Sequence, residues 1–272
     1  MACTGLLRLI PILALLSFGC STEGPLLGWL STAPPDLEVA DGATRATLVG
    51  RELAALGRPV LVHEPVAGRV TLLWGAPLAA VLATQRAANA GESTVLRCLD
   101  GYYVTLPEVA VQPQSPWLVW AGWGGGPFEA TDAQGKTVAL GPYYLVWDVT
   151  DAGAERPWPY QVHRLERVAR SVYEAITPPT SAAPAVQAGF ALYEGHCAKC
   201  HALGGVGGDL GPELNCPTNV TQYWQGDWLA RWIADPATLR RGARMPATGL
   251  APPEVAAVIA YLSYAATAFK CP

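Results

Sequence analysis

Residues 197–201 of the chain read Cys197-Ala198-Lys199-Cys200-His201. This C-x-x-C-H pattern is the signature of covalent attachment of a c-type haem. Thiols at positions i and i+3 lie on one helical turn, where each can form a thioether to a haem vinyl group, and the next residue is then placed beneath the iron. The segment therefore predicts one covalently bound haem c, held by Cys197 and Cys200, with His201 as the proximal iron ligand.

A C-x-x-C pair can also be half of a zinc site or a redox-active dithiol. A zinc site needs a second ligand pair at regular spacing, and none follows His201. A thioredoxin-like dithiol needs a βαβ setting, whereas the sequence around Cys197 and Cys200 has a helical pattern. We therefore favour the haem interpretation.

From Val186 onward the sequence resembles class I cytochrome c. Gly189 and Leu192-Tyr193 precede the haem motif, and Gly211-Pro212 follows it. The resemblance implies that Gly189 lets the first and last helices of the domain cross closely. It also implies that Pro212 lies at the haem edge, where a carbonyl of the Gly-Pro pair accepts the proton of the proximal imidazole.

Two further helices are expected after the haem motif. The segment 228–233 carries apolar residues at helical spacing and is stopped by Asp235-Pro236, and a last helix begins at Pro252. Between them, Arg244-Met245-Pro246 resembles the Met-Pro loop of the family, and Met245 is the only methionine besides Met1. The resemblance implies that Met245 is the distal iron ligand, a pairing that raises the reduction potential relative to bis-His ligation.

Three cysteines outside the haem motif and the N-terminal segment need an interpretation. Cys216 and Cys271 could form a disulfide in an oxidising compartment, which would tie the loop after the haem motif to the C-terminus. A free thiol at either position is the alternative, because spacing alone does not fix connectivity. We expect Cys98 to be a small buried residue.

The N-terminus is typical of a targeting segment. Arg8 supplies the positive charge and the apolar run from Leu6 to Phe18 is too short to span a bilayer comfortably. Gly19-Cys20 resembles a bacterial lipoprotein processing site, in which Cys20 would become the lipidated first residue; ordinary cleavage or an uncleaved anchor is the alternative. We expect an exported, periplasmic lipoprotein that meets the membrane through a lipid anchor on Cys20.

Length and charge set the outer limits. A chain of 272 residues suits two compact domains, and a net charge of −4 with 15% charged residues gives no basis for nucleic-acid binding. The expected order is a signal peptide (1–20), an N-terminal linker (21–43), a domain over 44–176, a Pro-rich linker (177–184) and a domain over 185–272. The predicted fold class is α+β multidomain, with a β-rich mixed α+β domain followed by an all-α cytochrome c domain.

The N-terminal domain shows short apolar runs bounded by turn residues, which predict strands. Few helix breakers and apolar residues at helical spacing predict two helices among them. The expected strands are Pro59–His63, Arg69–Trp74, Val95–Leu99 and Tyr144–Val149, and the expected helices are Thr47–Leu56 and Leu78–Ala88.

Four elements of this domain resemble the oxidoreductase molybdopterin-binding domain of the sulfite oxidase type. They are Trp74-Gly75-Ala76-Pro77-Leu78, Leu99-Asp100-Gly101-Tyr102, Leu106-Pro107 and Gly141-Pro142-Tyr143-Tyr144. Active members carry a molybdenum-binding cysteine upstream of the Trp-x-Gly element, and the stretch Val60–Leu73 contains no cysteine. We therefore expect a domain that kept this fold and binds no molybdopterin.

Three functions are compatible with these features. The first is a monohaem carrier that cycles between Fe(III) and Fe(II), exchanges electrons with a donor and an acceptor protein, and uses its N-terminal domain for docking or structure. The second is a molybdenum oxidoreductase with its own haem, or the haem subunit of one. The third is a sensing or structural lipoprotein whose haem changes an interaction surface. We favour the carrier, which needs no catalytic acid, base or nucleophile.

Overall fold

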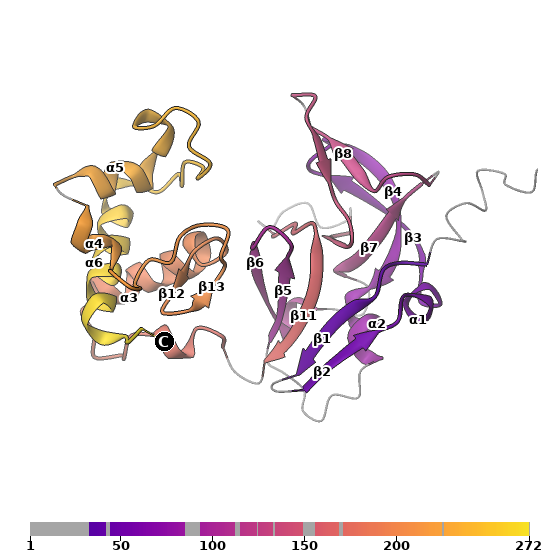
Figure 1. The fold of residues 1–272 in the computed structure, drawn as a ribbon, viewed down its shortest axis with the longest axis horizontal. Coiled ribbons are helices and arrows are strands. Elements are labelled where there is room, and N and C mark those ends of the chain that lie inside the picture. Colours follow the sequence, from indigo (N-terminus) through magenta and orange to yellow (C-terminus); the bar gives the residue numbers. More distant parts are fainter. Residues whose placement is uncertain are drawn as a thin grey trace, which may run out of the picture.

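The computed structural model describes residues 33–41, 44–84, 93–111, 115–123, 125–132, 134–148, 156–168, 171–224 and 226–271. A β-rich region (residues 33–168) and a helical region (residues 171–271) lie side by side (Figure 1). Cys20 and the expected signal peptide lie outside the described residues. Within the described ranges, no helix is both long enough and apolar enough to cross a membrane.

Two sheets build the β-rich region. The larger has the strand order β2-β1-β11-β5-β6 and the smaller has the order β10-β7-β4-β3. Their strands are β1 (Leu37–Asp41), β2 (Thr44–Leu48), β3 (Arg58–Glu64), β4 (Arg69–Pro77), β5 (Ser93–Cys98), β6 (Tyr103–Pro107), β7 (Trp117–Gly122), β10 (Tyr144–Val146) and β11 (Val162–Val168). A separate hairpin pairs β8 (Glu129–Thr131) with β9 (Thr137–Ala139). β1 runs parallel to β11, whereas β5 pairs antiparallel with both β11 and β6.

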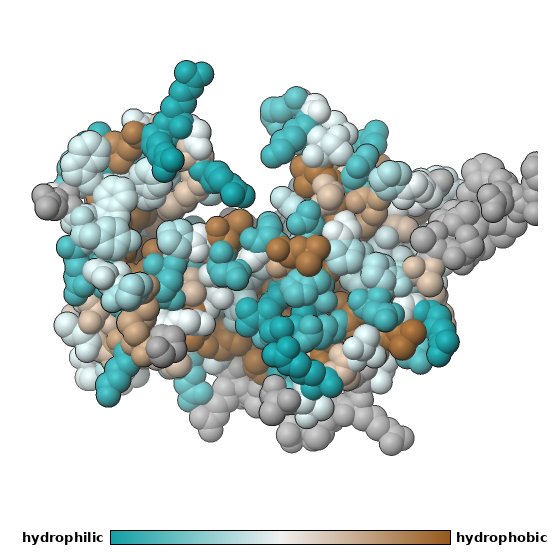
Figure 2. All heavy atoms as spheres, viewed as in Figure 1, coloured by the Kyte–Doolittle hydropathy of each residue, from teal (hydrophilic) through white to brown (hydrophobic). Residues whose placement is uncertain are grey.

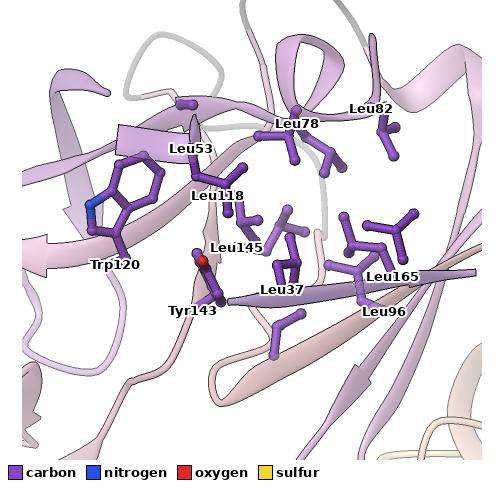
Figure 3. Close-up of a cluster of buried hydrophobic side chains, with 14 of the residues drawn as sticks. Leu37, Leu53, Leu78, Leu82, Leu96, Leu118, Trp120, Tyr143, Leu145 and Leu165 are labelled. Carbon is purple, nitrogen blue, oxygen red and sulfur yellow. The ribbon is translucent and has the colours of Figure 1, made fainter. Parts of the chain in front are cut away.

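One apolar core joins both sheets to the two short helices α1 (Gly50–Ala54) and α2 (Leu78–Ala83). Figure 3 shows Leu37 of β1, Leu53 of α1, Leu118 of β7 and Leu165 of β11 gathered in this core. Alternation of exposed and buried residues along β3 places one face of that strand toward the interior, whereas the continuous apolar run of β7 is buried on both faces.

The N-terminal edge of the domain differs from the prediction. Residues 37–41, expected to be linker, form β1, because Leu37 and Val39 alternate with more exposed neighbours and are buried in the core. The helix expected over Thr47–Leu56 begins only at Gly50, since Thr47 and Leu48 belong to β2.

Two other boundaries also differ. The strand expected to reach Val149 ends at Val146, which pairs with Trp117, the first residue of the antiparallel strand β7. The residue before Trp117 is Pro116, which has no N–H to continue the pairing. The helix α2 ends at Ala83, and the remainder of the expected helix, to Ala88, lies mostly outside the described residues.

The helical region contains the helices that the sequence predicts around the haem motif. Its elements are η2 (Glu174–Ile176), α3 (Pro184–Leu192), η3 (Tyr193–Cys197), β12 (Ala202–Leu203), β13 (Val206–Gly207), α4 (Val220–Tyr223), α5 (Trp228–Ala234), η4 (Pro236–Thr238) and α6 (Pro252–Ala268). A proline begins both α3 and α6, and the Glu254 carboxylate accepts a bond from the Ala251 N–H. The two-residue pair β12–β13 means that the region is not purely α-helical.

Gly189 sits at the crossing of α3 and α6. A Cβ at this position would lie 2.0 Å from the Ala257 carbonyl oxygen, so only glycine permits the contact. Beside the crossing, the Tyr261 ring of α6 packs against Phe190 and Tyr193, with ring centroids 5.4 Å apart in each pair. This is the close crossing that the resemblance to class I cytochrome c implies.

The segment expected to be a linker is packed against the helical region. The buried Ile176 carbonyl accepts a hydrogen bond of 2.7 Å from the Tyr261 hydroxyl, and the Gln187 side chain donates to the carbonyls of Thr180 and Ala182. Tyr173 is buried in a cluster that contains residues of both regions, among them Val95 of β5 and Tyr261 of α6.

A disulfide joins Cys216 to Cys271, with 5.5 Å between the Cα atoms. It connects the loop after the haem motif to the end of the chain beyond α6.

Replacing Gly189 with alanine should lower the free energy of unfolding by about 3 kcal/mol, because the added Cβ would force α3 away from α6. The measurement is urea denaturation followed by far-UV circular dichroism. The matched control is Gly195→Ala in the adjoining turn, where a Cβ would meet nothing within 4 Å. Equal stability of Gly189→Ala and the wild type would contradict the crossing.

Removing the disulfide by the double substitution Cys216→Ser and Cys271→Ser should lower the free energy of unfolding by about 4 kcal/mol, as expected from the entropy of a closed loop spanning 55 residues. The check is chemical denaturation with and without reductant. Reductant should bring the wild type down to the stability of the variant and leave the variant unchanged. A wild type that is insensitive to reductant would refute the link.

Candidate haem site

The haem motif lies directly after a π-helical turn. α3 continues into η3, and the Ala198 N–H donates to the Tyr193 carbonyl at 2.9 Å. The N–H groups of Cys200 and His201 both donate to the Cys197 carbonyl, at 3.0 and 2.9 Å. Such π-turns often occur at functional sites. The turn places the two thiols and the imidazole on one short stretch of backbone.

Both thiols of the motif are free and half-buried. Burial, and then the neighbouring Cys200, raise the pKa of Cys197 to about 12. Burial and Asp100 also raise the pKa of Cys200, against the opposing effect of Lys199. A redox-active dithiol has instead a lowered thiol pKa, because its thiolate is the nucleophile. The thiols of this motif thus differ from those of a redox-active dithiol in the direction of their pKa shifts.

The imidazole of His201 is held in one tautomer. Its Nδ1 lies 2.7 Å from the Pro212 carbonyl oxygen, which can only accept a hydrogen bond, so Nδ1 carries the proton. Nε2 is then left with its lone pair, which is the form of histidine that binds a metal. A Cβ at Gly211 would lie 2.4 Å from His201 Cε1, so only glycine fits beneath the ring.

The backbone on either side of His201 is also fixed. The buried Tyr193 hydroxyl donates to the His201 carbonyl at 2.8 Å, and the Gly211 N–H donates to the Cys200 carbonyl at 2.7 Å. The position of the imidazole is therefore set by η3 on one side and by the Gly211-Pro212 segment on the other.

Glu213 has a structural role that the sequence analysis did not find. Its carboxylate accepts bonds from the N–H groups of Gly204 and Gly205 at 2.7 and 3.0 Å, and from the Asn215 N–H at 2.9 Å. It thereby ties the turn between β12 and β13 to the segment that follows Pro212. The only sequence signal is the Gly204-Gly205 pair, whose positive φ angles form this turn.

Two buried asparagines connect the same segment to α6. The Asn219 amide donates to Asn215 Oδ1 at 2.8 Å and to the Leu262 carbonyl at 2.9 Å. Asn219 Oδ1 accepts from the Thr221 N–H and so caps α4. Buried amides need such partners, and here the partners fix the loop after the haem motif on the last helix.

Met245 lies half-buried on the segment between η4 and α6. This segment is attached to α5, because Thr248 donates through its N–H to the Ala234 carbonyl and through its hydroxyl to the Ile233 carbonyl. His196, which precedes Cys197, is exposed, as are His63 of β3 and Pro212.

The segments that resemble the molybdopterin-binding domain of the sulfite oxidase type lie in two places. Trp74–Leu78 and Gly141–Tyr144 lie around β4, α2 and β10. Leu99–Tyr102 forms the turn between β5 and β6, which reaches the haem motif. Cys98 is buried, as expected, at the end of β5.

The donor set fits a covalently bound haem c: two free thiols on one turn, followed by an imidazole whose Nε2 is available. Comparison with known protein families agrees. The model of the family described as "Cytochrome C oxidase, cbb3-type, subunit III" matches residues 184–262, which include the haem motif and Met245. A search of curated proteins found no match to the chain. The region 184–262 is therefore a cytochrome c domain, which implies a covalently bound haem and electron transfer with redox partners.

Proposed function

We propose that the chain is an exported monohaem electron carrier in which His201 and Met245 ligate the iron. The observation that carries the proposal is the bond from His201 Nδ1 to the Pro212 carbonyl, which leaves Nε2 for the iron. When bound, haem c supplies reversible one-electron Fe(III)/Fe(II) chemistry.

Each residue of the chain has a binding or orienting role in this proposal. Cys197 and Cys200 hold the group covalently, and the Pro212 carbonyl increases the basicity of the proximal imidazole. The thioether of Met245 is the distal ligand, and its softness favours the ferrous state. No residue has to move a proton, which agrees with the carrier interpretation.

For the N-terminal domain we propose a docking or structural role. Its mixed α+β architecture is compatible with the resemblance to the sulfite oxidase type, and the lack of cysteine in Val60–Leu73 is the reason for proposing no molybdopterin. The partners of the chain are then a donor and an acceptor redox protein.

Export to the periplasm and a lipid on Cys20 complete the proposal. The Cys216–Cys271 disulfide supports export, because such bonds persist in oxidising compartments.

In protein matured by a host that assembles c-type cytochromes, Met245→Ala should alter the low-spin optical spectrum and lower the reduction potential, because a soft axial ligand is lost. Reduced-minus-oxidised spectra and spectroelectrochemical titration measure both. The matched control is Leu250→Ala, which removes a half-buried side chain from the same segment. An unchanged spectrum in Met245→Ala would require another distal ligand.

Metal analysis of the same protein should give one haem iron per chain. Stoichiometric molybdenum, with haem reduction that depends on an added substrate, would support the oxidoreductase alternative and contradict the carrier.

Mass spectrometry of the N-terminal peptide, taken from protein isolated with the membranes, should show Cys20 as the first residue with an acyl modification. An unmodified N-terminus, or a mature chain that begins at another residue, would contradict the lipid anchor.

A further inference from the structure

The turn between β5 and β6 is bonded to the haem motif through backbone groups. The Tyr103 N–H donates at 2.9 Å to the carbonyl of Lys199, which lies between the two cysteines and directly before Cys200. The Asp209 N–H donates back to the Gly101 carbonyl at 3.0 Å. The hairpin of the N-terminal domain therefore binds both the haem motif and the loop that follows it.

Glycines at this contact bring the two backbones together. A Cβ at Gly101, whose φ is +89°, would lie 2.1 Å from Asp209 Oδ1 and 2.7 Å from the Leu210 nitrogen. A Cβ at Gly208 would lie 2.4 Å from the Lys199 oxygen and 3.0 Å from the Gly101 oxygen. Neither of the two backbone segments has room for a side chain at its glycine.

Apolar packing of β5 and β6 also supports the contact between the two regions. Alternation along β5 and β6 turns Leu96 and Val104 toward the core of the β-rich region, and turns Val95 and Tyr103 toward the helical region. Tyr103 is 3% exposed and packs edge-on against Tyr173, with ring centroids 6.4 Å apart.

A cation also braces the hairpin. The Arg97 guanidinium lies 5.0 Å from the centre of the Tyr103 ring and makes two hydrogen bonds to the Glu166 carboxylate, at 2.8 and 3.1 Å. The two regions are in contact over the lower part of the view in Figure 2 and are separated by a notch at the top. Arg97 thus links β6 to β11 where the regions meet.

The backbone of the turn lies close to the second attachment cysteine. The turn is held next to Cys200, because the preceding residue, Lys199, accepts the Tyr103 N–H. Tyr102 itself is half-buried. Asp100 Oδ1 accepts the Tyr102 N–H at 2.9 Å, which fixes the carboxylate in an Asx turn.

We propose that the turn Asp100–Tyr102 is a wall of the haem site on the Cys200 side, through which the N-terminal domain sets the reduction potential of the cytochrome. The potential of a haem depends on its exposure to water and on fixed charges nearby. Tyr102 excludes water on this side, and the negative charge of Asp100 stabilises the ferric state. This inference rests on the proposed haem carrier function and gives the N-terminal domain a direct part in it.

The substitution Asp100→Asn tests the charge, because asparagine keeps the oxygen that accepts the Tyr102 N–H. The midpoint potential should become more positive by about 30 mV, which is about a threefold change in the ferric-to-ferrous ratio, since tenfold corresponds to about 59 mV for one electron. The matched control is Asp132→Asn in the β8–β9 turn, where Asp132 Oδ1 likewise accepts backbone bonds from Gln134 and Lys136. A potential equal in Asp100→Asn and the wild type would overturn the proposal.

The substitution Gly101→Ala tests the contact independently of the haem. Amide hydrogen exchange at Asp209 and Tyr103 should become faster, because the added Cβ pushes the turn away from the loop. The matched control is Gly68→Ala in the β3–β4 turn, where φ is also positive, at +63°, and a Cβ would meet nothing within 4 Å. Unchanged protection of both amides in Gly101→Ala would show that the turn is not bound to the haem motif.

The two proposals fail in different ways. Absence of covalent haem from the matured protein would contradict the carrier function, at any rate of hydrogen exchange of the Asp209 amide. A normal low-spin haem whose reduction potential is the same in Asp100→Asn and the wild type is compatible with the carrier function. That result contradicts the proposal that the Asp100–Tyr102 turn sets the potential.

Discussion

The hydrogen bond from His201 Nδ1 to the Pro212 carbonyl is the constraint around which the cytochrome domain is arranged. It requires the segment after the haem motif to return beneath the imidazole. Residue 211 has to be glycine, because a Cβ at this position would overlap the His201 ring. Glu213 and the Asn215–Asn219 pair then hold this segment against the β12–β13 turn and α6. Each of these polar groups has a hydrogen-bond partner within the protein, so the loop is held by the domain's own residues.

The same domain depends on close helix packing on its other side. Gly189 brings α3 against α6, and this crossing places Tyr193 so that its hydroxyl reaches the His201 carbonyl. His201, the proposed proximal ligand, is therefore connected to the main helix pair through one buried tyrosine. A chain that cycles one electron benefits from such fixed ligation, because little has to rearrange when the charge of the iron changes.

The contact between the two regions gives the N-terminal domain a place in the electron-transfer proposal. Domains joined by a flexible linker move independently unless their interface is large and apolar. Here Ile176 and Tyr173 pack into the cytochrome core, and the β5–β6 turn bonds to the haem motif itself. The N-terminal domain is therefore in direct contact with the haem motif, which is the arrangement that the docking role proposed for this domain requires.

The sequence by itself predicted a haem-binding cytochrome c domain, because Cys197, Cys200 and His201 lie within five residues and local spacing fixes their relation through one helical turn. It also located α5 and α6 and four strands of the β-rich region, β3, β4, β5 and β10, because periodicity and proline positions are local signals. Only the tertiary structure showed that residues 37–41 form β1, that Glu213 braces the haem loop, and that the Asp100–Tyr102 turn lies on the haem motif. These features join residues far apart in the chain, and the stabilising bonds, many of them between backbone groups, leave no pattern in the order of side chains.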